Sequence, residues 1–237
     1  MYAHKGDSGK TNLGTGRVKK NSEIPLAISF MDSLCSYINL CVQKCKKINN
    51  KYSEPGEVIL ECKKINSEPG EVILECKKIN SEPGEVILEC MNILNDLKRI
   101  YNIIFDVNSI LALNRRRNIT LTREHVEESS AFLDERIKYF NSVLPELKRF
   151  INVTELSSDC SKFDMARTQC RIAEVYLVDA FDKNLERYCK VYTPNYTELK
   201  RPPQVEEASK FINRLSLYLF YVQRMINSFS HNKEVYR

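Results

Sequence analysis

The sequence FINRLSLYLFYVQRM, residues 211–225, has the apolar spacing of a buried helix face. Its large apolar side chains recur at intervals of three and four residues, which is the period of an α-helix. They are Phe211, Leu215, Tyr218, Leu219, Val222 and Met225. Such a stripe is stable in water only when another apolar surface covers it. We therefore expect an amphipathic helix over residues 204–230 and partner helices elsewhere in the chain.

Four other segments repeat this pattern. They cover residues 24–49, 85–113, 124–150 and 158–190. Leu144-Pro145 is expected to interrupt the third of them, because the residue before a proline is disfavoured in a helix. The pattern predicts one domain over residues 1–237 that is an all-α five-helix bundle, with an up-down four-helix core plus one further helix. Glycine placement agrees, because no glycine follows Gly84.

A tandem repeat lies between the first two predicted helices. The unit CKKINSEPGEVILE begins at Cys62 and again at Cys76, and a longer first copy begins at Cys45. Its Pro-Gly pair breaks a helix, whereas the E-V-I-L-E-C that follows can begin one. We predict that the 14-residue repeats over 45–89 form an extended connection between helices, because loops grow at little entropic cost. A partner-binding arm is the functional alternative.

The chain opens with a polar, glycine-rich loop of a kind that can bind phosphate. Four of the seven glycines lie within residues 6–16, together with hydroxyl and cationic side chains. Closely approaching backbone N–H groups, with lysine or arginine beside them, are what a polyphosphate needs. The segment is not a Walker A loop, because G-x-x-x-x-G-K-[ST] is absent and no strand is predicted before it. A disordered tail is the competing interpretation.

Arg167, Arg171 and Glu174 are spaced at i, i+4 and i+7, so they share one face of the fourth predicted helix. Arginines on an interior or interfacial face of a bundle need anionic partners. A surface stripe that pairs with neighbouring acids is the competing interpretation. Asn213, beside the apolar stripe of the last helix, is equally ambiguous.

Composition argues against several classes of protein. The net charge of +5 is too small to indicate nucleic-acid binding. The sequence contains no apolar run of 18 or more residues, so no membrane span is predicted. The polar start does not resemble a secretory signal, so we expect a cytoplasmic protein, or a mitochondrial-matrix protein whose leader is missing or cryptic. Nine cysteines without a C-x-x-C, and only three histidines, favour reduced thiols over a zinc site or disulfides.

Six blocks of sequence, in order, match the motifs of one family. Residues 2–17, YAHKGDSGKTNLGTGR, are similar to Y-T-x-T-G-D-x-G-x-T-x-L-x-x-G-R. The other five blocks lie at residues 32–36, 100–112, 144–151, 166–174 and 211–220. Among them are counterparts of L-P-x-L-x-x-F-I, A-R-T-x-x-R-R-A-E and F-L-N-R-L-S-D-Y-L-F. In all of these the chain resembles the propanediol-utilisation-type ATP:corrinoid adenosyltransferases, over nearly its whole length apart from the repeats.

The resemblance implies a homotrimer of five-helix bundles, with active sites between neighbouring subunits. The implied reaction transfers the 5′-deoxyadenosyl group of ATP, bound with Mg²⁺, to the cobalt of cob(I)alamin and releases triphosphate. Because the cobalt is the nucleophile, no Ser-His-Asp or Cys-His arrangement is required. The protein would hold ATP near the cobalt, neutralise the triphosphate and exclude water. A cobalamin-dependent acceptor enzyme would be a further partner.

Site residues carry over by matching position. The N-terminal loop would wrap the phosphates, and the fourth and last helices would complete the nucleotide site. These residues are His4, Lys5, Gly6, Thr11, Asn12, Lys20, Arg171, Glu174 and Asn213. Asp32 and Arg167 match a pair that forms an inter-subunit salt bridge near the corrinoid, and with Arg171 they make up the implied catalytic set. Phe150 matches an aromatic residue that closes the lower face of the cobalt, which eases reduction of Co(II) to Co(I). No protein-ligated metal is implied.

Several residues depart from the family's motifs. Lys5 replaces a threonine, Ser33 a glutamate, Ile172 the second arginine of R-R-A-E and Leu217 an aspartate, while Asn152-Val153-Thr154 replaces P-G-G. Ile172 removes a phosphate-facing charge, for which Lys5 would partly compensate. A catalytically weakened relative that binds ATP or delivers corrinoid is therefore a second hypothesis. The third is a helical interaction protein in which the repeats are the working part.

Overall fold

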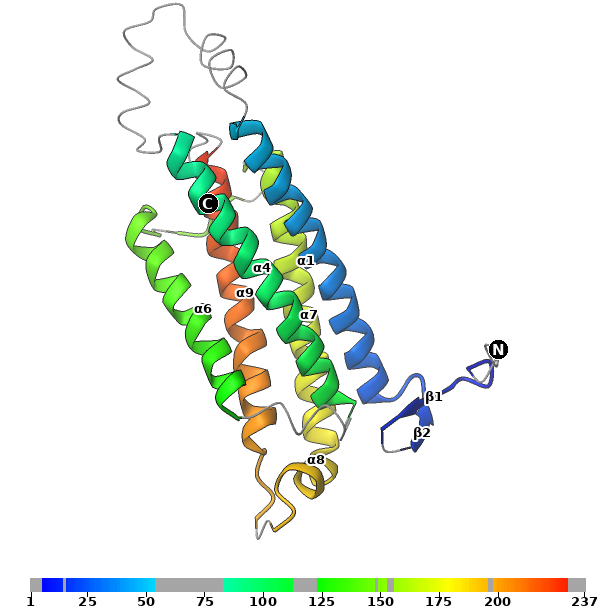
Figure 1. Cartoon of the computed structure of the whole chain (residues 1–237). Coiled ribbons are helices and arrows are strands. Elements are labelled where there is room, and N and C mark those ends of the chain that lie inside the picture. Colours follow the sequence, from blue (N-terminus) through cyan, green and yellow to red (C-terminus); the bar gives the residue numbers. More distant parts are fainter. Residues whose placement is uncertain are drawn as a thin grey trace, which may run out of the picture.

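The computed structural model describes residues 6–14, 16–53, 83–112, 123–147, 149–152, 156–195 and 198–229. Five long helices dominate this part of the chain and run in alternating directions (Figure 1). They are α1 (Glu23–Ser53), α4 (Pro83–Leu111), α6 (Arg123–Val143), α7 (Ser161–Lys183) and α9 (Pro203–Phe229). The predicted all-α architecture of five long helices is confirmed.

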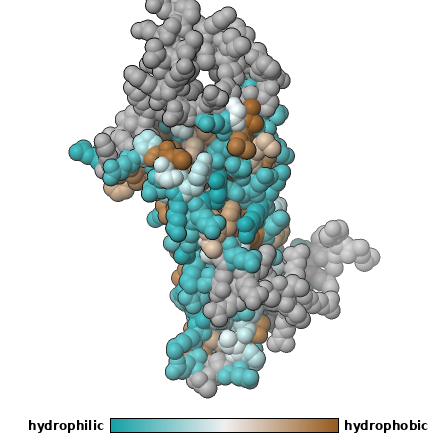
Figure 2. All heavy atoms as spheres, turned by 60° about the vertical axis from the view of Figure 1, so that its left-hand side comes forward, coloured by the Kyte–Doolittle hydropathy of each residue, from teal (hydrophilic) through white to brown (hydrophobic). Residues whose placement is uncertain are grey.

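The hydrophobic core lies among α1, α4, α7 and α9, while α6 packs mainly against α9. Each helix turns its predicted stripe inward, because burying one stripe against another removes apolar surface from water. On α9, Phe211, Leu215, Tyr218, Leu219 and Val222 are completely buried. The outer surface is correspondingly polar: the face in Figure 2 is mainly hydrophilic, with apolar atoms in small separate patches.

α1 is long and apolar enough to cross a membrane, by length and composition alone, over Glu23–Lys51. A core helix of a bundle needs the same composition. The α1 stripe of Ala27, Met31, Leu34 and Ile38 is completely buried, and α1 packs against both α4 and α7. We therefore assign α1 to the core of the bundle.

The fourth predicted helix is interrupted, contrary to the sequence pattern. α7 ends at Lys183, and α8 (Leu185–Tyr192) follows after Asn184, whose φ of −119° and ψ of 19° are not helical. A 3₁₀ turn, η2 (Ser158–Cys160), precedes α7. The third helix ends at Val143, as the following Leu144-Pro145 predicts, so it is shorter than the expected 124–150.

The connection between the first two long helices is shorter at both ends than the predicted 45–89. Residues 45–53 belong to α1, and Pro83 and Gly84 begin α4 instead of breaking a helix. Proline is tolerated there, because the N–H that it lacks would have no partner within the first turn. Residues 54–82, which hold the repeat sequence between the two helices, lie outside the described residues.

The glycine-rich opening forms a β-hairpin rather than an irregular loop. β1 (Lys10–Leu13) pairs antiparallel with β2 (Gly16–Lys19), and Thr11 lies opposite Val18. Gly16 has a φ of +125°, a conformation that side chains with a Cβ rarely adopt. The backbone N–H of Gly14 donates to the carbonyl of Ala112, which attaches the hairpin to the end of α4.

The seven cysteines within the described residues are all free and buried. Burial raises the pKa of the Cys41 thiol to about 12 and that of the Cys160 thiol to about 11. A neutral thiol is a poor nucleophile and a poor metal ligand. These cysteines therefore belong to the core, as the sequence predicts for reduced thiols. Cys62 and Cys76 lie outside the described residues.

Candidate active site

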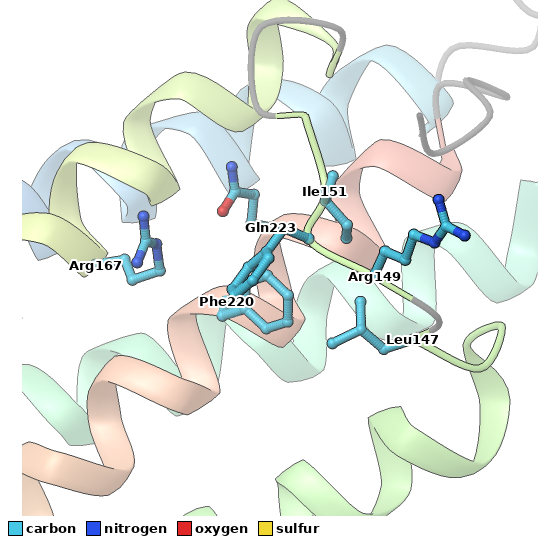
Figure 3. A pocket seen from close by; sticks show the side chains of 7 residues that line it. Leu147, Arg149, Ile151, Arg167, Phe220 and Gln223 are labelled. Atoms are coloured by element: carbon cyan, nitrogen blue, oxygen red, sulfur yellow. The ribbon is translucent and has the colours of Figure 1, made fainter. Parts of the chain in front are cut away.

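A cavity of about 530 Å³ opens where α7, α9 and the segment after α6 meet (Figure 3). The described residues that line it are Leu147, Arg149, Phe150, Ile151, Arg167, Phe220 and Gln223. Two of them, Phe150 and Arg167, were predicted on the corrinoid side of the site. Phe150 is 87% exposed, which leaves a large apolar ring available to a ligand.

Helix α9 holds the segment that carries Phe150. Arg224 is 1% exposed, and its Nη2 donates to the carbonyl oxygen of Pro145 at 2.6 Å. Beyond Phe150, the backbone N–H of Ser157 donates to Oδ1 of Asn227 at 3.1 Å. Both ends of the segment are thus fixed to the same helix. Pro145 and Ser157, on either side of Phe150, are therefore both held against α9.

Arg167 reaches the cavity from α7 (Figure 3). Its Nε and Nη2 donate to Oδ1 of Asp164, at 3.0 and 2.8 Å. Asp32, the predicted partner of Arg167, instead accepts a hydrogen bond from Nδ2 of Asn108 at 2.8 Å. Burial raises the pKa of Asp32, and the hydrogen bond from Asn108 opposes this effect. Within one chain, Arg167 therefore pairs with Asp164, and Asp32 pairs with Asn108. Both members of the predicted inter-subunit salt bridge are present, but each has another partner.

Two residues predicted for the nucleotide site meet on the surface between α7 and α9. Nδ2 of Asn213 donates to Oε1 of Glu174 at 2.8 Å. Arg171 is exposed and lies about one turn before Glu174 on α7. Three exposed apolar residues lie within about a turn of these positions along the two helices: Ile172, Val175 and Leu217. Exposed apolar side chains therefore lie on both helices that carry this polar group.

The hairpin brings the predicted phosphate-binding residues into one small unit. The backbone N–H of Lys20 donates to the carbonyl of Gly9, and a Cβ at Gly6 would lie only 3.0 Å from Nζ of Lys20. The lysine ammonium therefore rests against the glycine backbone. Thr11 and Asn12 lie on β1 of the same hairpin, opposite Val18 and Arg17. A cation, hydroxyls and accessible backbone suit a phosphate. His4 and Lys5 lie outside the described residues.

The hairpin and the cavity lie apart within one chain. Figure 1 shows β1 and β2 beside the end of the bundle where α1 begins, projecting away from the helices. Arg167 lies near the start of α7, at the opposite end of the bundle. A single chain therefore keeps the predicted triphosphate-binding hairpin apart from the cavity.

Sequence reasoning missed five of the seven described lining residues, namely Leu147, Arg149, Ile151, Phe220 and Gln223. Phe220 lies in a block that matches the family's motifs, but the resemblance implies no role for it. One feature of the sequence could have pointed to Gln223: it is a polar residue next to Val222, within an apolar helical stripe. Its position on the cavity wall depends on how α9 packs, which the stripe alone does not show.

The chain matches known proteins in sequence and in fold. The model of the cobalamin adenosyltransferase family matches residues 1–73 and 61–226, and the two matches overlap within the repeats. A corrinoid adenosyltransferase of Bacillus subtilis (strain 168) is 26% identical over 229 residues, which are 96% of this chain and 86% of that relative. A variant PduO-type ATP:corrinoid adenosyltransferase from Lactobacillus reuteri, complexed with cobalamin and ATP, has a TM-score of 0.63 at 21% identity, with 100% of this chain and 98% of that chain covered. A second variant, complexed with ATP, has a TM-score of 0.60 at 20% identity, with 100% and 99% covered.

The bundle therefore has the fold of the PduO-type ATP:corrinoid adenosyltransferases. Because the family model spans almost the whole chain, the chain belongs to the cobalamin adenosyltransferase family. It is accordingly an enzyme, a corrinoid adenosyltransferase by class.

Proposed function

We propose that the chain transfers the 5′-deoxyadenosyl group of ATP to cob(I)alamin in the cavity beside Phe150, at a site completed by a neighbouring copy of the chain. The observation that carries this proposal is the shared cavity of Phe150 and Arg167. The two residues come from different elements, and the sequence match had assigned both to the corrinoid side. Their convergence supports that assignment.

The cavity wall suits a large, flat, mainly apolar ligand with polar edges. Leu147, Ile151 and Phe220 offer apolar contact, and Arg149 and Arg167 offer cationic donors. Phe150 would lie against the lower face of the cobalt and exclude an axial ligand. The cobalt then forms a bond to C5′ of ATP while the C5′–O bond breaks, and the electron pair leaves with the triphosphate. Arg171 and Lys20 would neutralise the charge of that leaving group.

A homotrimer with inter-subunit sites would account for the separation of the hairpin from the cavity. A second copy could place its hairpin against the exposed face that carries Arg171 and Glu174. The same contact would cover Ile172, Val175 and Leu217, which are exposed in one chain. In this arrangement the Asp32 of one copy would reach the Arg167 of the next.

Mg²⁺ would enter the site with the triphosphate. The part of the chain that the structure describes contains no group of three His, Cys, Asp or Glu that could hold a metal ion. Mg²⁺ commonly binds through substrate phosphates, water and only one or two carboxylates. Glu174 offers one carboxylate in the proposed nucleotide site, so the residues present fit this mode of binding.

One observation favours a weakened relative as the second candidate. Ile172 is exposed next to Arg171, where the matched motif has another arginine. The site then neutralises the triphosphate with one cation fewer, which would slow the departure of the leaving group. Binding of ATP and corrinoid would persist in such a protein.

Anaerobic incubation with chemically reduced cobalamin and Mg-ATP tests the proposal. Conversion to adenosylcobalamin is followed by absorbance, and triphosphate is measured in the same sample. Product supports the enzyme, and ATP binding without product supports the weakened relative. If neither ligand binds, the proposed function is wrong and the interaction-protein hypothesis is favoured.

A further inference from the structure

Gln223 differs chemically from every other described residue that lines the cavity. Four of these residues are apolar, namely Leu147, Phe150, Ile151 and Phe220, and the other two are Arg149 and Arg167. A guanidinium group donates hydrogen bonds but cannot accept them. Among the described lining side chains, only the Gln223 amide both donates and accepts.

The amide nitrogen of Gln223 is enclosed and unsatisfied. The residue is 2% exposed, and its Nε2 is buried without a hydrogen-bond partner. The polar groups around it on α9 are engaged: the carbonyl of Gln223 accepts from Sγ of Cys160, and Asn227 accepts from Ser157. A buried polar group without a partner destabilises the folded protein, so its presence requires an explanation.

Gln223 lines the cavity, and a change of its side-chain torsions would turn its enclosed amide nitrogen toward an occupant. Figure 3 shows Gln223 between Arg167 and Ile151, with Phe220 beside it. Rotation about the last side-chain torsion exchanges the amide oxygen and nitrogen, so either end can be turned toward an occupant. An occupant that offers a donor and an acceptor side by side would satisfy both.

We propose that Gln223 recognises the corrinoid by pairing its amide with a primary amide on the rim of the ring, each amide donating one N–H to the carbonyl oxygen of the other. The proposal rests on the proposed function, which places the corrinoid beside Phe150 and Arg167. Corrinoids carry acetamide and propionamide groups around the macrocycle. Arg149 and Arg167 cannot accept from these N–H groups, whereas Gln223 can. Gln223 thus fixes the rotation of the ring above Phe150.

Gln223→Met tests this assignment, because methionine has nearly the same size and no amide. We expect the KM for reduced cobalamin to rise about three- to tenfold, with the KM for ATP and kcat close to wild type. The Tm of the ligand-free variant should rise by about 2 °C, because the unsatisfied amide is gone. A purely structural glutamine would give the opposite pattern, with lower Tm and an unchanged KM for cobalamin.

Gln204→Met is the matched control. Oε1 of Gln204 is also buried without a partner, and Gln204 lies near the start of α9, away from the cavity. Its replacement should leave both KM values unchanged.

Measurements on the wild-type protein distinguish failure of the proposed function from failure of the Gln223 assignment. If it neither binds nor adenosylates reduced cobalamin, the proposed function and this assignment both fall. If it is active and Gln223→Met leaves the KM for cobalamin unchanged, or raises that for ATP instead, only the assignment is overturned.

Discussion

Arg171 is exposed on α7, about one turn from the carboxylate of Glu174 that accepts the Asn213 amide. In the proposed site its guanidinium group meets the triphosphate. We expect Arg171→Ala to lower kcat by about 100-fold or more, because a lost charge-stabilising donor acts mainly in the transition state. The proposed oligomer should stay intact, because the charge of Arg171 would meet the phosphates rather than the neighbouring copy. Steady-state kinetics and light scattering measure the two effects.

Arg201→Ala is a suitable control for this prediction. Arg201 binds Asp182 through an exposed ion pair just before α9, so its loss removes the same charge away from the proposed site. Its kcat should match wild type. Wild-type kcat and ATP affinity in Arg171→Ala would remove Arg171 from the site.

At the scale of elements, a polar network ties α6 to the core helix α4. Arg136 on α6 donates through Nε to Oδ2 of Asp96 at 2.6 Å and through Nη2 to Oε1 of Glu89 at 2.5 Å. The hydroxyl of Tyr218 on α9 donates to the same oxygen of Asp96 at 3.0 Å. Since α6 precedes the Phe150 segment, this network helps to fix where the cavity wall begins.

Arg136→Met should destabilise the fold by about 3 kcal/mol at pH 7, because two carboxylates then lose their buried cation. Burial already raises the pKa of Asp96, and loss of Arg136 raises it further. A carboxylate with a raised folded pKa stabilises the fold at low pH and loses that contribution as the pH rises through its pKa. The difference from wild type should therefore shrink between pH 7 and about pH 5. Urea unfolding at both pH values measures it.

The triple variant Glu89→Gln, Asp96→Asn, Arg136→Met removes the uncompensated charges and should recover much of the lost stability. A loss in Arg136→Met that is the same at both pH values would contradict the electrostatic explanation.

At the scale of the whole molecule, a deletion tests whether the repeats only connect two helices. Deletion of residues 62–89 removes two units and joins Glu61 to Cys90. The PGEVILE at 55–61 is identical to that at 83–89, so Val58 and Glu61 would replace the buried Val86 and Glu89 at the start of α4. We expect activity close to wild type in the anaerobic assay.

Deletion of residues 90–103 is the contrasting control, because it removes the completely buried Ile93, Leu97 and Ile100 and should unfold the protein. Loss of fold in the 62–89 deletion would show that the repeats do more than connect two helices.

Sites shared between copies predict complementation between inactive variants. Lys20→Glu disables the hairpin and Arg171→Ala disables the α7 face. When the two proteins are unfolded and reassembled together, mixed oligomers contain sites with an intact hairpin from one copy and an intact α7 from the other. We expect about a quarter of wild-type activity for a random mixture with heterologous contacts. Activity no greater than the sum of the separate variants would place the whole site in one chain.

The helices could be predicted because their signal is local. Apolar spacing over residues 211–225 requires a helix with one buried face, and Leu144-Pro145 fixes the end of α6. The pattern could not locate the break at Asn184, since the apolar spacing continues on both sides of that residue. It also could not show that Pro83-Gly84 begins α4 or that the opening residues pair as a hairpin, because both depend on local geometry that the residue types permit without requiring.

The amino-acid order alone determined the five-helix class, the family resemblance and the residue types available for phosphate and corrinoid. Only the folded arrangement decided that Phe150 and Arg167 share a cavity, that Glu174 meets Asn213, that the hairpin lies apart from this cavity and that the amide nitrogen of Gln223 is enclosed. The physical reason is range. Helical periodicity arises among residues three and four apart, whereas a cavity and a buried polar atom depend on contacts between segments that are distant in the chain.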